Sequence, residues 1–269
     1  MTTVSRFDTA VGQLAVATQG SGPPAVLWHS LFVDDRSWDA VADDLAPHRT
    51  LIRITGPGHG ASSALTAPFS LDDCADAAGE VLQAFEIEQA VDWVGNGWGG
   101  HVGLVLAARQ PPRVRTLTTF NTPVAALTRE QRKAPRLAKT LLSTVGAVRP
   151  LRDGIASALL SPQARAERPG LVAYVHDCLR SADRRALAHT VRSISLDRPD
   201  LTPLLSSIVA RSVMVTGSDD ELWTLDQARA AASRMPNAVA EEVSGSAHLT
   251  PLERPDEAAR IILQHWSDI

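Results

Sequence analysis

Cysteine is scarce in this sequence, and long apolar runs are missing. The 269 residues include two cysteines, Cys74 and Cys178. Their wide separation fits neither a metal-binding motif nor a disulfide framework, so we expect a protein of the reducing cytoplasm. The first residues lack the basic and then apolar pattern of a signal peptide. No segment approaches the roughly 20 apolar residues of a transmembrane helix, so we expect no membrane insertion.

An excess of basic residues is also missing. Lysine and arginine number 26 against 30 acidic residues, which gives a net charge of −4 at pH 7. A nucleic acid or an anionic membrane is therefore not an expected partner. Hydrophobic residues make up 44% of the chain and charged residues 21%, as is typical of a globular protein. The expected partner is a small-molecule substrate, and the oligomeric state stays open.

Strand and helix patterns alternate through most of the chain. Two alternating runs, Val4–Asp8 and Gln13–Thr18, predict a hairpin. The continuous apolar run Ala25–Trp28 is typical of a strand buried on both faces. Further strands are predicted at Leu51–Ile54, Ala90–Val94, Val114–Phe120, Ser212–Thr216 and Ala238–Val243, and helices near 37–46, 71–85, 98–109, 225–234 and 255–266. The alternation predicts the α/β class, with a mostly parallel sheet flanked by helices.

One long region contains only helical patterns. It runs from about residue 124 to residue 204, and Ser161 and Ser181 are expected helix N-caps within it. We therefore expect a single α/β core domain, interrupted by a helical cap insertion. The expected boundaries are 1–123 and 205–269 for the core and 124–204 for the cap.

Several short segments follow predicted strands in a characteristic order. They are Trp28–Phe32 (WHSLF), Gly56–Ser62 (GPGHGAS), Gly95–Gly99 (GNGWG), Gly217–Asp220 (GSDD) and Ala247–Leu249 (AHL). Each motif alone is modest, but the ordered set resembles the α/β-hydrolase fold superfamily across essentially the whole chain. The likeness is to its capped branch of lipases, esterases and epoxide hydrolases. It implies a cap after the sixth strand, a small-molecule substrate, and neither a cofactor nor a metal.

The nucleophile motif departs from the family pattern. Its usual form is G-x-S-x-G, and this chain has Gly97 at the centre. Glycine has no side chain with which to form an acyl-enzyme, so covalent serine or aspartate catalysis is excluded at this position. Glycine does relieve a turn in which strain costs other residues about 1–3 kcal/mol. Three explanations stay open: a turn relaxed after loss of use, a laboratory replacement of serine, and natural chemistry without a nucleophile.

The resemblance also maps an acid–base pair and an oxyanion hole. It assigns the general base to His248, in the loop after the last strand. Asp220 stands where the family places the acid that orients this histidine, and Asp219 is the competing choice. The backbone N–H groups of Leu31 and Trp98 would form the oxyanion hole. Trp98 opens a helix, so its amide has no partner within that helix.

Other residues near these motifs have less certain roles. Ser30 and Asn121 are expected at the substrate pocket. Ser30 stands where the family more often has glycine, and Asn121 lacks the charge that would stabilise an imidazolium. His29 and His59 belong to turn motifs that recur without catalytic roles, so both are expected to be structural. Asp34, in the loop after the third strand, is expected to be a solvated acid.

The leading functional hypothesis is an α/β-hydrolase-family enzyme. Its substrate would be a small apolar ester, lactone or related carbonyl compound. With Gly97 native, His248 would activate water or remove a proton from the substrate, and such general-base action contributes about 10²–10⁴ in rate. The alternatives are a cofactor-free lyase, isomerase or cyclase, and a non-catalytic protein that binds a small ligand. The intact acid–base pair argues against simple binding, and the missing nucleophile argues for it.

Overall fold

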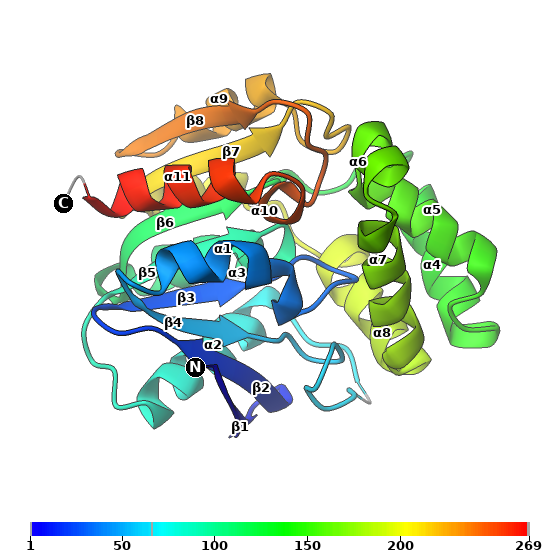
Figure 1. Cartoon of the computed structure of the whole chain (residues 1–269), viewed down its shortest axis with the longest axis horizontal. Helices are drawn as coiled ribbons and strands as arrows, with labels where there is room; N and C mark the ends of the chain where they lie inside the picture. Colours follow the sequence, from blue (N-terminus) through cyan, green and yellow to red (C-terminus); the bar gives the residue numbers. More distant parts are fainter. Residues whose placement is uncertain (1, 66, 268–269) are drawn as a thin grey trace.

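An eight-stranded sheet forms the centre of the molecule (Figure 1). The computed structural model describes residues 2–65 and 67–267. The first two strands form an antiparallel hairpin that joins the sheet edge, and the other strands run parallel, in the spatial order β1-β2-β4-β3-β5-β6-β7-β8. The strands are β1 (Thr3–Thr9), β2 (Gly12–Gln19), β3 (Pro24–Trp28), β4 (Thr50–Ile54), β5 (Val91–Asn96), β6 (Val114–Phe120), β7 (Arg211–Gly217) and β8 (Ala238–Val243). The prediction of a mostly parallel α/β sheet is confirmed.

Helices cover both faces of this sheet. One face carries α1 (Asp39–Leu45) and α11 (Pro255–Ser267), and the other carries α2 (Leu71–Ala84), α3 (Trp98–Arg109) and α9 (Leu225–Ala232). Short helical turns complete the core: η1 (Asp35–Trp38), η2 (Pro111–Arg113) and α10 (Thr250–Glu253). Because successive side chains of a strand point to opposite faces, the apolar run in β3 serves two separate cores. Val26 and Trp28 pack toward α2 and α3, and Ala25 and Leu27 pack toward α1 and α11.

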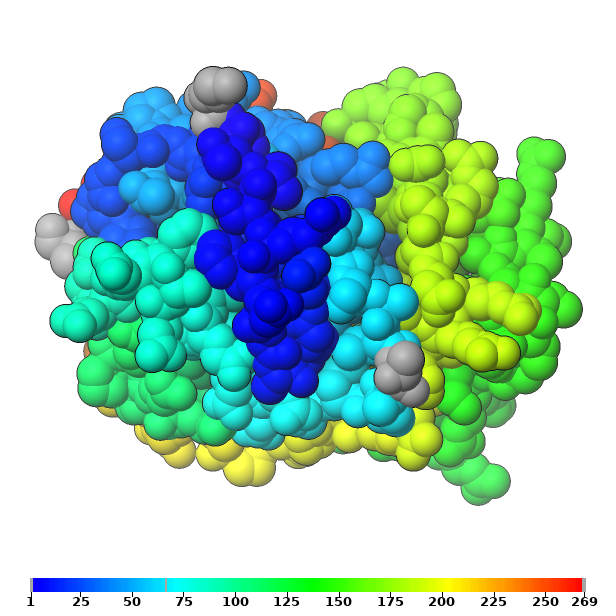
Figure 2. Space-filling view, turned by 90° about the horizontal axis from the view of Figure 1, so that it is seen from below, coloured from blue at the N-terminus to red at the C-terminus, as the bar shows by residue number. Residues whose placement is uncertain are grey.

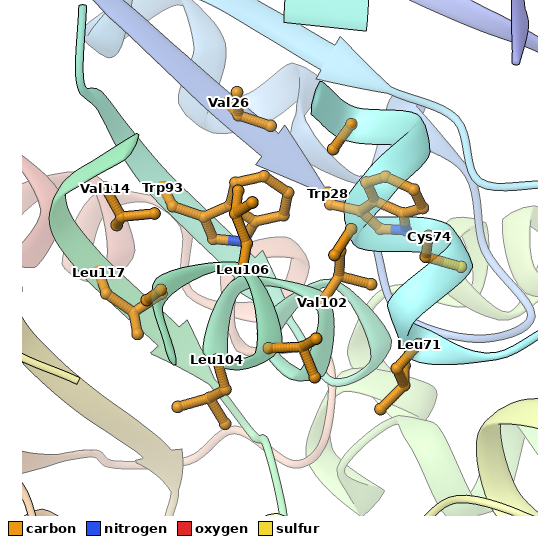
Figure 3. Packing of buried hydrophobic residues seen from close by; sticks show 14 of the residues in the cluster. Val26, Trp28, Leu71, Cys74, Trp93, Val102, Leu104, Leu106, Val114 and Leu117 are labelled. Atoms are coloured by element: carbon orange, nitrogen blue, oxygen red, sulfur yellow. The ribbon is translucent and has the colours of Figure 1, made fainter. Parts of the chain in front are cut away.

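The core beneath α2 and α3 is rich in tryptophan. The rings of Trp28 and Trp93 stack with their centroids 6.3 Å apart (Figure 3). Trp98 meets Trp28 edge-on at 5.6 Å. Aromatic pairs in these arrangements add to the stability that burial of their area provides. They fix the strand ends from which the loops of the candidate site begin.

A block of helices, residues 124–204, separates β6 from β7. It contains α4 (Lys133–Thr144), α5 (Arg149–Leu159), α6 (Pro162–Glu167), α7 (Pro169–Ser181), α8 (Arg184–Val191) and the π-helical turn η3 (Arg192–Leu196); η4 (Thr202–Ser207) then leads back to the sheet. In Figure 1 the block lies beyond the arrowheads of the central strands. Its apolar core includes Val175 and Leu187 and continues into Val33 and Leu249 of the sheet domain.

One expected helix start in this block is wrong. Ser181 is the last residue of α7, and its hydroxyl donates to the Asp177 carbonyl at 2.9 Å. The N-cap of α8 is Asp183, whose carboxylate accepts the amides of Arg185 and Ala186. Both residue types cap helices well, and the ionised carboxylate is also favoured by the positive end of the helix.

The helical block also contacts the loop between β4 and α2. Figure 2 shows the β1–β2 hairpin in dark blue across one face, with the cyan segment after β4 beside the yellow-green end of the block. The Phe69 amide donates to the Ser193 hydroxyl at 3.0 Å. Among the described residues, no helix is long and apolar enough to cross a membrane.

Candidate active site

A sharp turn with Gly97 at its apex joins β5 to α3. Gly97 has φ 50° and ψ −105°, a conformation that glycine adopts far more easily than other residues. Its carbonyl accepts the His101 amide at 3.0 Å, which begins the hydrogen-bonding of α3. Gly95 and Gly99 flank the turn. Both positions require glycine, because a Cβ on Gly95 would collide with the backbone of Gly99 and a Cβ on Gly99 would collide with the backbone of Trp28. The strand–turn–helix of the nucleophile motif is therefore present, without a side chain at its centre.

His248 and Asp220 lie together at the ends of the neighbouring strands. His248 Nδ1 is 3.0 Å from Asp220 Oδ2. The other carboxylate oxygen, Oδ1, accepts the Leu222 amide at 2.9 Å, and Oδ2 also accepts the Asn121 side-chain amide at 2.9 Å. Asp219, the competing choice, is exposed and its carboxylate accepts a hydrogen bond from the neighbouring Ser218 hydroxyl.

The surroundings keep Asp220 ionised. Burial alone would raise the pKa of this carboxyl, but the charge and hydrogen bond of His248, with the bonds from Leu222 and Asn121, hold the pKa below its ordinary value. A carboxylate can only accept, so His248 Nδ1 carries the proton. In the neutral imidazole the lone pair is then on Nε2.

His248 Nε2 faces the apex of the turn. A Cβ built on Gly97 would lie 3.0 Å from this nitrogen. The loop that carries the histidine is held through its backbone. The Asn96 side chain donates to the His248 carbonyl at 3.0 Å, and the amides of His248 and Leu249 both donate to the Leu159 carbonyl of α5 at 3.1 and 3.2 Å. The helical block thus helps to position the histidine, which the sequence motifs could not reveal.

Two backbone amides on the segments that meet near the turn lack an acceptor among the described residues. Within the described part of the chain, neither Leu31 N–H nor Trp98 N–H donates a hydrogen bond to another protein group. Trp98 is the first residue of α3, where amides have no intrahelical acceptor and the helix dipole favours negative charge. The family resemblance predicted these two amides as the donors of the oxyanion hole, and that role stays a prediction.

Two neutral histidines shape the loop that carries Leu31. His29 Nε2 accepts the Gly56 amide at 2.8 Å, and Nδ1 donates to the Ser30 carbonyl at 2.7 Å. His59 Nε2 accepts the Phe32 amide at 3.3 Å. Burial lowers the pKa of His29 to about 4 and that of His59 to about 3, so both rings stay neutral and hold the loop. This agrees with their expected structural role.

Ser30 and Asn121 occupy different positions relative to the site. Asn121 is buried, and its side-chain amide donates to the Asp220 carboxylate and to the Ala247 carbonyl, both at 2.9 Å. The Ser30 hydroxyl lies beside Gly97, 2.5 Å from the position that a Cβ would occupy there. It is buried, with no hydrogen-bond partner among the described residues. The sequence motifs predicted Ser30 at the substrate pocket, but they did not indicate this closeness to Gly97.

Asp34 is buried, which corrects the expectation of a solvated acid. Its side chain is 3% exposed and lies 2.8 Å from the Arg36 guanidinium. The Tyr174 hydroxyl of α7 donates to Asp34 Oδ1 at 3.0 Å. Burial would raise the pKa of this carboxyl, but the Arg36 hydrogen bonds and charge lower it below its ordinary value. The pairing links the loop after β3 to the helical block.

Comparison with known proteins assigns the chain to a family. The model of the alpha/beta hydrolase family matches residues 25–261. The chain belongs to this family. Among the described residues, no group of three or more histidine, cysteine or acidic side chains could hold a metal ion.

Curated relatives of this alpha/beta hydrolase include proteins that are named as an esterase and as hydrolases. It is 29% identical over 258 residues to a pimeloyl-[acyl-carrier protein] methyl ester esterase of Xanthomonas campestris pv. campestris, which covers 90% of this chain and 94% of that relative. It is 39% identical over 111 residues to the 2-hydroxymuconate semialdehyde hydrolase of Pseudomonas sp. strain CF600. That second match covers 41% of this chain and 36% of the relative.

Solved structures share the fold of this alpha/beta hydrolase. The enol-lactonase of Burkholderia xenovorans LB400 has a TM-score of 0.90 at 21% identity, with 98% of this chain and 100% of that chain covered. An esterase from Thermogutta terrifontis has a TM-score of 0.89 at 19% identity, with 99% and 98% covered. These likenesses concern the fold, and the chemistry of this chain has to be argued from its own residues.

Proposed function

We propose that this protein is a hydrolase for small apolar esters, lactones or related carbonyl compounds. His248 acts as the general base, oriented and stabilised by Asp220. The amides of Leu31 and Trp98 form the oxyanion hole. The observation that carries the proposal is the position of His248 Nε2, which is 3.0 Å from a Cβ built at the apex of the turn while Nδ1 is bonded to Asp220.

The proposed chemistry follows from charges that develop during the reaction. When a hydroxyl group attacks the substrate carbonyl, its proton passes to His248 Nε2, and the ionised Asp220 stabilises the resulting imidazolium. The carbonyl oxygen becomes negative and accepts hydrogen bonds from the N–H groups of Leu31 and Trp98. Removal of one such donor typically lowers kcat by about 10²–10³. The imidazolium then returns its proton to the leaving oxygen.

We also propose that the helical block, residues 124–204, acts as the cap of this site. His248 is 8% exposed and Ser30 is 1% exposed, so the surrounding segments shield both side chains from most of the solvent. The apolar core of the block extends to Leu31 and Phe32 of the loop after β3. An apolar lining of this kind suits an apolar substrate, and the exclusion of water strengthens the electrostatic interactions within the site.

The direct test is a His248→Gln variant assayed on a panel of p-nitrophenyl esters and simple lactones. We expect kcat/KM to fall by about 10²–10⁴, the usual contribution of a general base. His48→Gln is the matched control, because His48 is exposed and lies far from this loop in the sequence. It should retain wild-type turnover. A wild-type protein that hydrolyses no member of the panel, or hydrolysis unaffected by His248→Gln, would contradict the proposal.

A further inference from the structure

An unpartnered serine hydroxyl lies beside the vacant nucleophile position. Ser30 Oγ is buried and forms no hydrogen bond among the described residues. A buried hydroxyl without a partner is costly to a folded protein, and such exceptions call for an explanation. Ser30 Oγ lies 2.5 Å, and His248 Nε2 lies 3.0 Å, from the same point, the position of a Cβ on Gly97. These distances add to 5.5 Å, the greatest separation that the two atoms can have.

We propose that Ser30 is the nucleophile of this chain, in place of the side chain that Gly97 lacks. The inference rests on the proposed function, because it identifies the hydroxyl whose proton His248 removes. Gly97 makes the arrangement possible, since any Cβ at that position would be within 2.5 Å of the Ser30 oxygen. The absence of a side chain at Gly97 thus leaves the space in which the Ser30 hydroxyl can react.

The backbone of Ser30 is fixed, so that rotation of its side chain is the main movement that the reaction needs. The Ser30 carbonyl is held by His29 Nδ1 at 2.7 Å, and the Phe32 amide by His59 Nε2 at 3.3 Å. General-base hydrogen bonds are often long in unliganded enzymes and shorten to about 2.6–3.2 Å when substrate binds. Rotation about χ1 of Ser30 moves its hydroxyl relative to His248 without any change in the loop.

The oxyanion donors suit attack from Ser30. In the usual motif the residue after the nucleophile supplies one amide of the oxyanion hole. Leu31 follows Ser30 in the same way, and its N–H has no other acceptor among the described residues. The second donor, Trp98, belongs to the facing turn. The two amides therefore lie on the two chain segments that flank the Ser30 hydroxyl.

The proposed reaction has two balanced halves. Ser30 Oγ bonds to the carbonyl carbon while its proton moves to His248 Nε2 and the carbonyl π pair becomes the oxyanion. Collapse of this intermediate breaks the carbon–oxygen bond of the ester, and the leaving oxygen takes the proton from His248. Water then gives a proton to His248 and attacks the acyl group. Release of the acid returns that proton to Ser30 Oγ.

The first test uses a fluorophosphonate probe on the full-length protein, with the labelled peptide identified by mass spectrometry. We expect the label on Ser30, and its loss in Ser30→Ala and in His248→Gln. Ser37→Ala is the matched control, because Ser37 is another buried serine, in the turn η1 that follows the loop of Ser30, and it should label like the wild type. Ester turnover should fall in Ser30→Ala by several orders of magnitude, as removal of the nucleophile does in subtilisin, where kcat falls by about 2 × 10⁶.

A second test needs no knowledge of the substrate. Ser30→Cys places a thiol beside His248, and we expect iodoacetamide to alkylate it quickly at neutral pH. Combining Ser30→Cys with His248→Gln should slow the alkylation at least tenfold. The native cysteines should give little background, because burial raises the pKa of Cys178 to about 12 and raises that of Cys74 well above its ordinary value, and the thiolate is the reactive form.

The outcomes separate this inference from the proposed function. If Ser30→Ala is folded and keeps His248-dependent ester hydrolysis, Ser30 is not the nucleophile, but the acid–base proposal stands. The same conclusion follows if the probe labels another residue or if alkylation of Ser30→Cys is independent of His248. If the wild type neither takes the probe nor hydrolyses any ester, both proposals fall.

Discussion

The two halves of the candidate site are held in different ways. In the acid–base half, Asp220 accepts three hydrogen bonds and the loop of His248 is fixed by Asn96 and the Leu159 carbonyl. In the nucleophile half, Gly97 has no side chain and the Ser30 hydroxyl has no partner among the described residues. The first half is therefore complete without a substrate. The second keeps a hydroxyl and two amides that have no protein partner among the described residues.

This difference shows which part of the site contains polar groups without hydrogen-bond partners. A buried polar network is stabilising when every member is bonded, and an unbonded member lowers stability. Ser30 Oγ and His248 Nε2 both lie close to one point, the position of a Cβ on Gly97. Strain and unsatisfied groups are found at functional sites when the surrounding structure is strong enough to hold them. The saturated half supplies that support here, and the following predictions test the contrast.

The largest expected effect comes from placing a hydroxyl group at position 97, at the apex of the turn. In the double variant Gly97→Ser with Ser30→Gly, the new side chain meets His248 Nε2, and Ser30 no longer occupies the space. We expect ester turnover at least about 10²-fold above that of Ser30→Gly alone, because the base and both oxyanion donors are already in place. The fluorophosphonate label should move to the peptide that contains position 97. Ester assays and peptide mapping measure both effects.

The single variant Gly97→Ser is the matched control for this swap. Its Cβ would be 2.5 Å from Ser30 Oγ, so the two side chains compete and turnover should be lower than in the double variant. Both variants should lose about 1–3 kcal/mol of unfolding free energy, since serine must adopt the turn conformation that glycine tolerates. A folded double variant that takes no label would show that His248 and Asp220 do not have the geometry of a triad.

As the pH is lowered, the nucleophile half should lose stability at a higher pH than the acid–base half does. The neutral rings of His29 and His59 hold the loop of Ser30, and their pKa values in the folded protein are about 4 and 3. The unfolded chain has its histidine pKa near 6.5, so it binds more protons between pH 6.5 and 4. Stability is complete above pH 6.5 and is lost as the pH falls through this window, by about 3 kcal/mol for His29. Urea unfolding at pH 7.5, 5.5 and 4.5 measures the loss.

The pKa of Asp220 in the acid–base half is also lowered, but the loss of stability that follows from it begins at a lower pH. The lowered pKa of Asp220 means that its contribution is present above the ordinary carboxyl pKa near 4 and is lost only as the pH falls below that value. At pH 5, hydrogen exchange should therefore increase for amides 29–34 more than for amides 246–249. His59→Gln should reduce the pH slope, and His48→Gln should leave it unchanged. Equal exchange in both loops at pH 5 would contradict this assignment.

The sequence predicted the sheet well because its signals are local. The run in β3 is apolar because both faces of the sheet are covered at that strand. The residues around Gly97 are glycines because the backbone of a neighbouring segment approaches closely. Motifs at strand ends also predicted His248, Asp220, Leu31 and Trp98 as site residues. The structure places His248 Nδ1 beside Asp220 and His248 Nε2 beside Gly97, and the catalytic roles of all four stay predictions.

The remaining features depend on contacts between distant segments. The burial of Asp34 requires Tyr174 of α7, and nothing near Asp34 in the sequence signals that partner. The N-cap at Asp183 in place of Ser181 reflects the competition between two good capping residues two positions apart. The approach of Ser30 to Gly97 depends on how the loop after β3 folds over the turn after β5. The sequence therefore predicted Ser30 at the substrate pocket but did not indicate its closeness to Gly97.

The smallest expected effect tests how the helical block is coupled to each half. Tyr174→Phe removes the hydroxyl that donates to Asp34 Oδ1 at 3.0 Å and accepts the Asp34 amide at 3.2 Å. Asp34 keeps its ion pair with Arg36, so we expect a loss of only about 1–2 kcal/mol of unfolding free energy in urea titrations. Arg180→Gln, an exposed change on the same helix, should cost less than about 0.5 kcal/mol. Tyr174→Phe should increase hydrogen exchange in residues 31–36, which lose their bond to α7. Residues 246–249 should stay protected, because the loop of His248 is held by a separate contact, the Leu159 carbonyl. An equal increase in both loops would mean that the block holds the two halves as one unit, and the contrast between them would not extend to their dynamics.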